Sequence, residues 1–141
     1  MKFQTVDLKI IPTNGGDVMH ALKVSEKSFK DFGELYFSCV MPKSIKAWKK
    51  HKHMTMNLIV PCGLVKFVLL DEDNPLKFNE VIIGKSKKDR NLYKRLTIEP
   101  NTWFGFQGIS KFESLVVNLA DIEHTSSEVE RKEIDSIPYL W

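Results

Sequence analysis

Side chains capable of proton chemistry are concentrated in one segment, IKAWKKHKHMTMNLIVPCG, residues 45–63. The segment is otherwise strand-like, and in an extended chain successive side chains alternate between two faces. Alternation puts Lys49, His51 and His53 on one face, and Lys50 and Lys52 on the other. Cations on a face that turns inward are costly to bury without a partner or a function. We therefore expect this segment to carry the functional site.

Short apolar segments separated by turn residues predict strands along most of the chain. The turn Pro61-Cys62-Gly63, and the run 71–75 after a strand at 64–70, form a hairpin signature. No long segment has helical periodicity, and the polar tail around 126–133 is the best helix candidate. Many short strands joined by turns indicate an all-β sandwich or barrel of antiparallel strands. The expected strands cover about 2–11, 18–25, 34–41, 44–53, 57–60, 64–70, 78–83, 92–98, 104–107 and 114–119.

Length and charge limit the class of protein. The 141 residues suit a single domain spanning 1–141. Lys and Arg number 21 against 18 Asp and Glu, an excess too small to indicate nucleic acid but compatible with an anionic small molecule. No apolar run approaches the length of a membrane span, and the start lacks a signal-peptide core, so we expect no membrane partner and a cytoplasmic location. Cys39 and Cys62 have neither CxxC spacing nor a disulfide framework, which favours buried free thiols.

Five motifs recur in an order typical of one family. They are GELYFSCV at 33–40, KAW at 46–48 with a basic, histidine-rich run after it, a hairpin at 63–71, P-x-x-W-x-G-F at 100–106, and the ending IPYLW at 137–141. Together, from about Gly16 to the C-terminus, they resemble the dTDP-4-dehydrorhamnose 3,5-epimerase family, in particular its short branch.

The resemblance implies a cupin-type double-stranded β-helix, or jelly roll, that forms a homodimer. It also implies a nucleotide-linked 4-keto-6-deoxyhexose as substrate, with no metal or other cofactor. In this family a base removes the hydrogen next to the C4 ketone, a cation or hydrogen-bond donor stabilises the enolate oxygen, and an acid on the opposite face returns the proton.

The sequence departs from the family pattern at several positions. Lys49 stands where the family has its general-base histidine, and Phe104 replaces a second histidine. The family's acid tyrosine falls near His124, and the carboxylate that orients the base corresponds to Asp135 or Glu133. These changes predict inversion at C3 alone rather than 3,5-epimerisation. The alternatives are 3,4-ketoisomerisation and a paralogue that binds a sugar nucleotide without catalysis.

The choice of base follows from side-chain pKa values. A lysine base at neutral pH would need its pKa lowered from about 10.4 to about 7, or about 4.6 kcal/mol of differential interaction. A histidine needs almost no change. We therefore favour His51 as base, or His124 as acid or base, with protonated Lys49 stabilising an enolate at O4. A salt bridge from Lys49 to the substrate phosphates or to Asp135 is the alternative.

Other polar side chains are candidates for substrate binding. Thr55 and Asn57 continue the face of His53 and could hydrogen-bond sugar hydroxyls, or could only satisfy main-chain groups at a barrel rim. His53 lies at a strand end, where a solvent-facing side chain is the alternative. Trp48, Trp103, Tyr36 and Phe106 are expected in the core, and Tyr36 is the one of these that could instead contact ligand, because its hydroxyl suits a half-wet wall. The substrate-binding set is Lys46, His53, Thr55, Asn57 and Tyr36.

A metal site is the competing interpretation of the histidines. His51-x-His53 followed by Asn57 approaches the first metal motif of metallocupins. Asn57 stands where a carboxylate ligand would be, and Phe104 where the last histidine would be. Two ligands hold a transition metal poorly, so we expect no metal.

Overall fold

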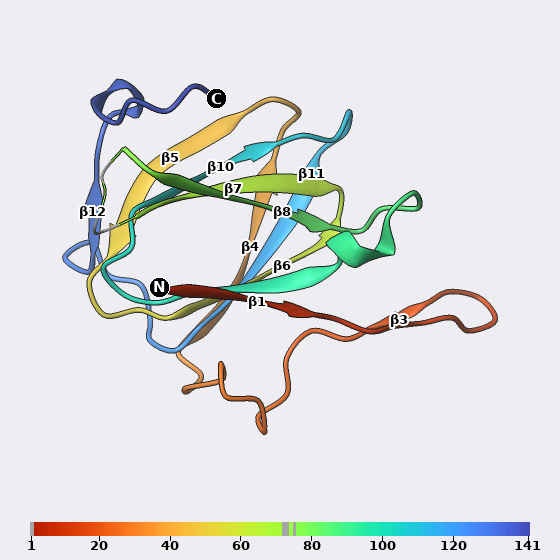
Figure 1. Cartoon of the computed structure of the whole chain (residues 1–141). Coiled ribbons are helices and arrows are strands. Elements are labelled where there is room, and N and C mark those ends of the chain that lie inside the picture. The colour runs from red at the N-terminus through yellow and green to blue at the C-terminus, as the bar shows by residue number, and fades with distance from the viewer. Residues whose placement is uncertain (1, 72–73, 75) are drawn as a thin grey trace.

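The computed structural model describes residues 2–71, 74 and 76–141. Two five-stranded antiparallel sheets pack face to face, as the predicted jelly roll requires (Figure 1). The first sheet has the order β1 (Phe3–Asp7), β9 (Lys94–Ile98), β6 (Met56–Cys62), β11 (Ser114–Ala120) and β4 (Glu34–Val40). The second has the order β12 (Val129–Arg131), β5 (Ile45–His51), β10 (Phe104–Gly108), β7 (Leu64–Leu70) and β8 (Phe78–Gly84).

A small hairpin and two short helical turns lie outside these sheets. β2 (Ile10–Ile11) and β3 (Val18–Met19) form a two-stranded hairpin that projects from the body (Figure 1). The helical elements of the described residues are the 3₁₀ turns η1 (Arg90–Leu92) and η2 (Ile134–Ser136).

The main core fills the space between the two sheets. Alternate residues of each strand point inward, which the strand period of two explains. In β11, for example, the buried residues are Ser114, Val116, Asn118 and Ala120, and those between them are partly exposed. The fully buried Val60 from one sheet and Val65 and Phe67 from the other belong to the same cluster.

Gly63 makes the crossing from one sheet to the other possible. β6 pairs with β9 and β11, whereas β7 pairs with β10 and β8, so the tight turn predicted at 61–63 joins two sheets. Gly63 has φ +81°, and a Cβ there would lie 2.1 Å from Ser114 Oγ. A residue without a side chain is therefore required. The hairpin itself is β7–β8; its turn at 71–75 lies partly outside the described residues.

Three sequence predictions of secondary structure are wrong in their extent or type. The strand expected at 2–11 divides after Asp7, because β1 pairs with β9 whereas Ile10 and Ile11 pair with Met19 and Val18. The strand expected at 18–25 ends at Met19. The helix candidate at 126–133 instead contains β12, whose register puts Arg131 opposite Lys49 of β5. Tertiary pairing overrides local propensity there.

A bulge in β5 changes which residues share a face. Phe104 pairs with Lys49 and Phe106 pairs with Lys46, so two residues of β10 correspond to three of β5. Strict alternation would put Lys46 and Lys49 on opposite faces, whereas the extra residue puts both on the inner side. Trp48 packs on the outer side with Ile137 and Val68.

The C-terminal tail covers the outer face of the second sheet. Trp48 Nε1 donates to Ile134 O at 3.1 Å, and its ring packs against those of Tyr139 and Trp141. Lys66 lies over the same two rings. Because Trp48 immediately precedes Lys49, this packing fixes β5 from behind.

Arg95 fastens the segment after the projecting hairpin to the first sheet. Its side chain is 1% exposed and donates to Ala21 O, Ser28 Oγ and Glu26 Oε2. The pKa of Glu26 is lowered chiefly by this hydrogen bond. These contacts explain why residues 20–28 form a loop and not the rest of a strand.

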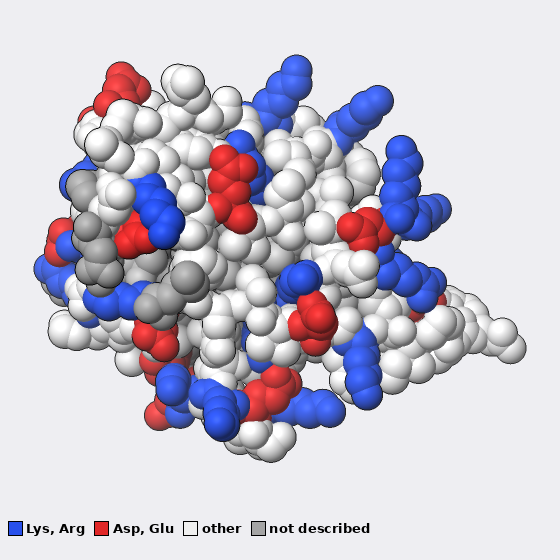
Figure 2. Space-filling model, viewed as in Figure 1, with Lys and Arg blue, Asp and Glu red and all other residues white. Residues whose placement is uncertain are grey.

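The surface carries charges of both signs. Blue and red side chains are interspersed over the visible face, and the projecting hairpin is mostly white (Figure 2). Cys39 and Cys62 are free as predicted, but both are exposed and not buried, because each is on the outer side of its strand. Within the described residues, no helix is long and apolar enough to cross a membrane.

Candidate functional site

Two adjoining cavities lie between the sheets. The outer cavity, of about 330 Å³, is lined by Glu34, Tyr36, Lys49, His51, His124, Val129 and Arg131. The inner cavity, of about 40 Å³, is lined by mainly apolar residues that include Phe104 and Phe106, and by Asn118. Tyr36, Lys49 and His51 line both, so these three side chains surround the passage between the two cavities. The outer cavity therefore brings together four of the predicted site residues, Tyr36, Lys49, His51 and His124.

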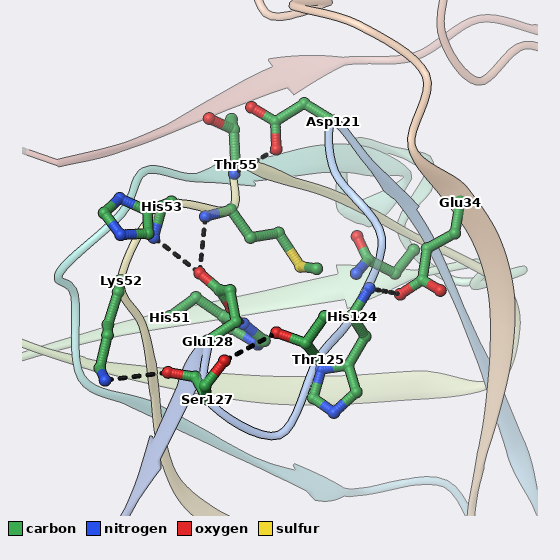
Figure 3. Close-up of polar contacts among 12 residues, drawn as sticks. Glu34, His51, Lys52, His53, Thr55, Asp121, His124, Thr125, Ser127 and Glu128 are labelled. Carbon is green, nitrogen blue, oxygen red and sulfur yellow. Dashed lines mark hydrogen bonds and ion pairs between the residues drawn. The ribbon is translucent and has the colours of Figure 1, made fainter.

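A histidine–carboxylate pair forms the polar centre of the site. His51 Nδ1 lies 2.5 Å from Glu128 Oε2, and the two residues are 5% and 6% exposed. Glu128 Oε1 accepts from the main-chain N–H groups of His53 at 2.6 Å and Met54 at 2.9 Å (Figure 3). A carboxylate only accepts hydrogen bonds, so the proton is on Nδ1 and the lone pair is on Nε2. The pair thus fixes the tautomer that a base needs.

Burial and hydrogen bonding set the charges of this pair. Burial lowers the pKa of His51 below its ordinary value, against the opposing effect of the hydrogen bond that His51 Nδ1–H donates to Glu128. Phe104 contributes to that burial, since its ring stacks on the imidazole with centroids 6.2 Å apart. For Glu128, burial acts to raise the pKa, but the hydrogen bonds from His53, His51 and Met54 outweigh it and lower the pKa. His51 is therefore neutral and Glu128 ionised at neutral pH.

Lys49 contributes a cation or an amine to the same cavity. It is half-buried, and its cross-strand partner on β12 is Arg131. Burial, followed by the charges of Arg131 and Lys46, lowers its pKa. Like charges directly opposite each other on a sheet are unfavourable. Packing alone therefore does not explain why Lys49 and Arg131 face each other.

Tyr36 and His124 complete the polar wall. Asn118 Nδ2 donates to Tyr36 Oη at 3.1 Å, while Asn118 Oδ1 is buried without a hydrogen-bond partner in the described structure. The His124 ring lies edge-on to that of His51, with centroids 6.2 Å apart. Its position is held by a hydrogen bond from its main-chain N–H to Glu34 Oε1 at 3.1 Å.

Five predicted site residues lie outside the cavity lining. His53 follows the end of β5 and is exposed. Lys46 Nζ donates to Ser38 Oγ at 2.9 Å and Cys39 O at 2.7 Å. On the opposite side of its sheet, Asn57 Nδ2 donates to Ser28 O and Asn57 Oδ1 accepts from Thr97 Oγ1. The main-chain N–H of Thr55 donates to Asp121 Oδ1. Asp135 is exposed on η2, so Glu128 and not Asp135 is the carboxylate beside His51.

Glu128 and Arg131 are site residues that sequence reasoning missed. Both belong to a polar tail with four glutamates between 123 and 133, and periodicity there does not tell which one turns inward. Their selection depends on β12 pairing with β5, which puts Val129 opposite His51 and the preceding Glu128 beside the ring.

The described part of the chain holds no group of three or more His, Cys, Asp and Glu side chains suited to a metal ion. Proton transfer and charge stabilisation are what the cavity residues provide directly.

No family model and no curated protein matches the chain. Solved structures do match the chain. A dTDP sugar isomerase from Desulfovibrio desulfuricans G20 is 37% identical over 99% of this chain and 90% of that chain, with a TM-score of 0.88.

More distant structures share the fold. The sugar 3,4-ketoisomerase QdtA from Thermoanaerobacterium thermosaccharolyticum, solved with TDP, is 19% identical over 96% of this chain and 94% of that chain, with a TM-score of 0.74. A dTDP-4-dehydrorhamnose 3,5-epimerase from Sulfolobus tokodaii is 16% identical over 99% of this chain and 81% of that chain, with a TM-score of 0.80. With the 37% identical relative, the jelly roll and the histidine-centred cavity, the chain belongs to the dTDP-4-dehydrorhamnose 3,5-epimerase-like family of cupin-type sugar-nucleotide epimerases and isomerases.

Proposed function

We propose that this protein is an isomerase that removes a proton next to the ketone of a nucleotide-linked 4-keto-6-deoxyhexose, with inversion at C3 as its main outcome. The single observation that carries the proposal is the buried His51–Glu128 pair at the cavity, in which Nε2 of a neutral imidazole is the free base. The 37% identical dTDP sugar isomerase supports a dTDP-linked substrate.

The side chains of the cavity have distinct parts in this reaction. His51 takes the proton from C3, and Glu128 stabilises the imidazolium that results. Lys49 and Arg131 line the same cavity, where a cation would stabilise the oxygen on which negative charge develops. Tyr36 and His124 are the remaining proton donors of the lining. We propose that no cofactor takes part, because enolisation needs only a base and charge stabilisation.

A second outcome, 3,4-ketoisomerisation, is favoured by one specific contact. His124 lies beside His51, with ring centroids 6.2 Å apart, so two imidazoles lie together at one end of the cavity. Moving the ketone from C4 to C3 requires proton transfers at two neighbouring carbons. Two neighbouring proton carriers suit that reaction.

The test is proton NMR in deuterium oxide with dTDP-4-keto-6-deoxyglucose and its CDP counterpart. We expect the H3 signal to disappear while H5 persists; a 3-keto product would identify the ketoisomerase. Inversion with exchange at both C3 and C5 contradicts the single-centre proposal. Binding without any exchange would identify the non-catalytic paralogue.

A pair of histidine variants tests the base. We expect His51→Asn to lower the exchange rate by on the order of 100-fold or more. His53→Asn is the matched control, because His53 contributes only its main-chain N–H to the site and its side chain is exposed. A His51→Asn rate within a few-fold of wild type shows that another group is the base.

We propose a homodimer in which a second copy covers the outer face of β4 and β11. Leu35 and Phe37 are 49% and 64% exposed there, and Leu119 and Val117 are their cross-strand partners. β4 is also the last strand of its sheet, and an exposed apolar edge of this kind favours association. Light scattering should give a dimer mass for wild type and a monomer mass for Phe37→Lys. Leu76→Lys, at an exposed leucine of the loop before β8, should stay dimeric.

We also propose that the protein is cytoplasmic. Its support is the two exposed free cysteines, which persist as thiols in a reducing compartment.

A further inference from the structure

Lys49 lies beside the proposed base, His51, in the wall of the cavity. It lines both the outer and the inner cavity, as Tyr36 and His51 also do. Lys49 and His51 are two residues apart on β5 and point the same way. If the ketone carbon of a substrate lay between these two side chains, the Lys49 amine would reach that carbon. His51 would then reach the hydrogen on the neighbouring carbon.

The surroundings of Lys49 differ from those of its neighbours in the sequence. Lys46 Nζ is bonded to Ser38 Oγ and Cys39 O, and Lys50 Nζ forms an ion pair with Glu130 at 3.0 Å. Lys49 Nζ has no hydrogen-bond or ion-pair partner among the residues that the structure describes. The amine is therefore not held as an ammonium by an acidic group.

The charged groups around the outer cavity influence the protonation of the Lys49 amine. Arg131 on β12 and Lys46 on β5 are the cations that act on it directly. Of the acids, Glu34 on β4 accepts from the His124 main chain, and Glu128 is committed to His51, His53 and Met54. Burial and the two cations lower the pKa of Lys49, which increases the fraction of free amine. Desolvation beside another cation is a known way to activate a lysine as a nucleophile.

We propose that Lys49 is a nucleophile that condenses with the C4 ketone of the substrate to form an iminium ion, from which His51 removes the C3 proton. The inference rests on the proposed function, since it supplies a covalent route for the same enolisation. It replaces the expectation that Lys49 acts only as a cation beside an enolate.

The chemical steps balance with water as the only other reactant. The Nζ lone pair adds to C4, one proton is taken up, and O4 leaves as water to give the iminium. His51 Nε2 takes the proton from C3, and the C3–H electrons form the C3–C4 double bond of a neutral enamine. A second proton donor of the lining, Tyr36 or His124, gives a proton to the opposite face of C3 and restores the iminium with inverted configuration. Solvent then reprotonates that donor and takes the proton from His51. Addition of water then releases the ketone, the free amine and the proton taken up at the start.

Reductive trapping tests the proposal directly. Wild-type protein is incubated with dTDP-4-keto-6-deoxyglucose and sodium cyanoborohydride, which reduces iminium ions in preference to ketones, and is then analysed by intact and peptide mass spectrometry. We expect one adduct, with the mass of the sugar nucleotide less one water plus two hydrogens, on the peptide that contains Lys49. Lys50→Met is the matched control and should trap as wild type does, because Lys50 faces away from the cavity.

A charge-preserving variant separates the nucleophile from a simple cation. Lys49→Arg keeps the positive charge but cannot form an iminium, so we expect no adduct and H3 exchange slower by on the order of 100-fold or more. H3 exchange within tenfold of wild type in Lys49→Arg would overturn the proposal, as would wild-type H3 exchange without an adduct on Lys49.

The same experiments distinguish failure of the nucleophile from failure of the proposed function. H3 exchange without trapping leaves the isomerase intact and refutes the iminium. An adduct without exchange confirms the amine chemistry and refutes the isomerase. Neither exchange nor adduct refutes both.

Discussion

Glu128→Gln is the substitution that tests the site most sharply. Glu128 accepts three hydrogen bonds, from the main-chain N–H groups of His53 and Met54 and from His51 Nδ1. A glutamine keeps the size and one carbonyl oxygen, which can still accept from the main chain. Its NH₂ group then faces Nδ1, and a favourable contact requires the imidazole to carry its proton on Nε2 instead. The nitrogen that faces the substrate would lose its lone pair.

The expected loss of activity follows from this change of tautomer. In serine proteases, replacing the orienting carboxylate by an amide lowers kcat by about 10⁴-fold. A loss of about 10³ to 10⁴-fold in the rate of H3 exchange corresponds to about 4–5.5 kcal/mol of transition-state stabilisation. Loss of charge-assisted hydrogen bonds at a buried carboxylate should also lower the free energy of unfolding, by about 2–3 kcal/mol.

The assay compares three proteins by H3 exchange and by thermal unfolding. Glu130→Gln is the matched control, since Glu130 lies two residues along the same tail, has a 43% exposed side chain, and forms only a surface pair with Lys50. We expect the control to keep its exchange rate within a few-fold and its stability within about 1 kcal/mol. If folded Glu128→Gln exchanges H3 within tenfold of wild type, the histidine–carboxylate pair is not the catalytic base.

Two further predictions concern pH and the turn between the sheets. The pKa of His51 is lowered from its ordinary 6.5, chiefly by burial, so the unfolded chain binds more protons than the folded chain as the pH falls through that value. The stability associated with neutral His51 should be complete above about pH 6.5 and be lost on acidification. Thermal melts from pH 8 to pH 5 should show a smaller decrease in Tm for His51→Asn than for wild type, and equal decreases would contradict the assignment. Gly63→Ala should lower the free energy of unfolding by about 2–4 kcal/mol, because it adds left-handed strain and a clash with Ser114. Gly15→Ala, with φ +90° and nothing within 4 Å of the added Cβ, should cost less, and an equal loss would show that the clash contributes nothing.

Strand placement was largely determined by the sequence. The strands β4 to β11 fall where alternation and turn residues predicted them, because half-buried strands with Gly and Pro between them carry a local signal. The jelly roll and the family followed from motifs that run from 33–40 to 137–141, and Lys49, His51, His124 and Tyr36, all singled out in the sequence, line one cavity.

The tertiary structure alone decided which polar residues complete the site. Alternation along β5 was correct for Lys49 and His51, but the strand ends at His51, so His53 turns to solvent. The bulge at 47–48 puts Lys46 on the inner side, against the sequence period. Glu128 reaches His51 only because the tail folds back as β12, a contact between residues 77 positions apart. Local sequence reports which residues can form a strand or ionise, whereas the partner of a buried charge depends on long-range pairing that no local pattern encodes.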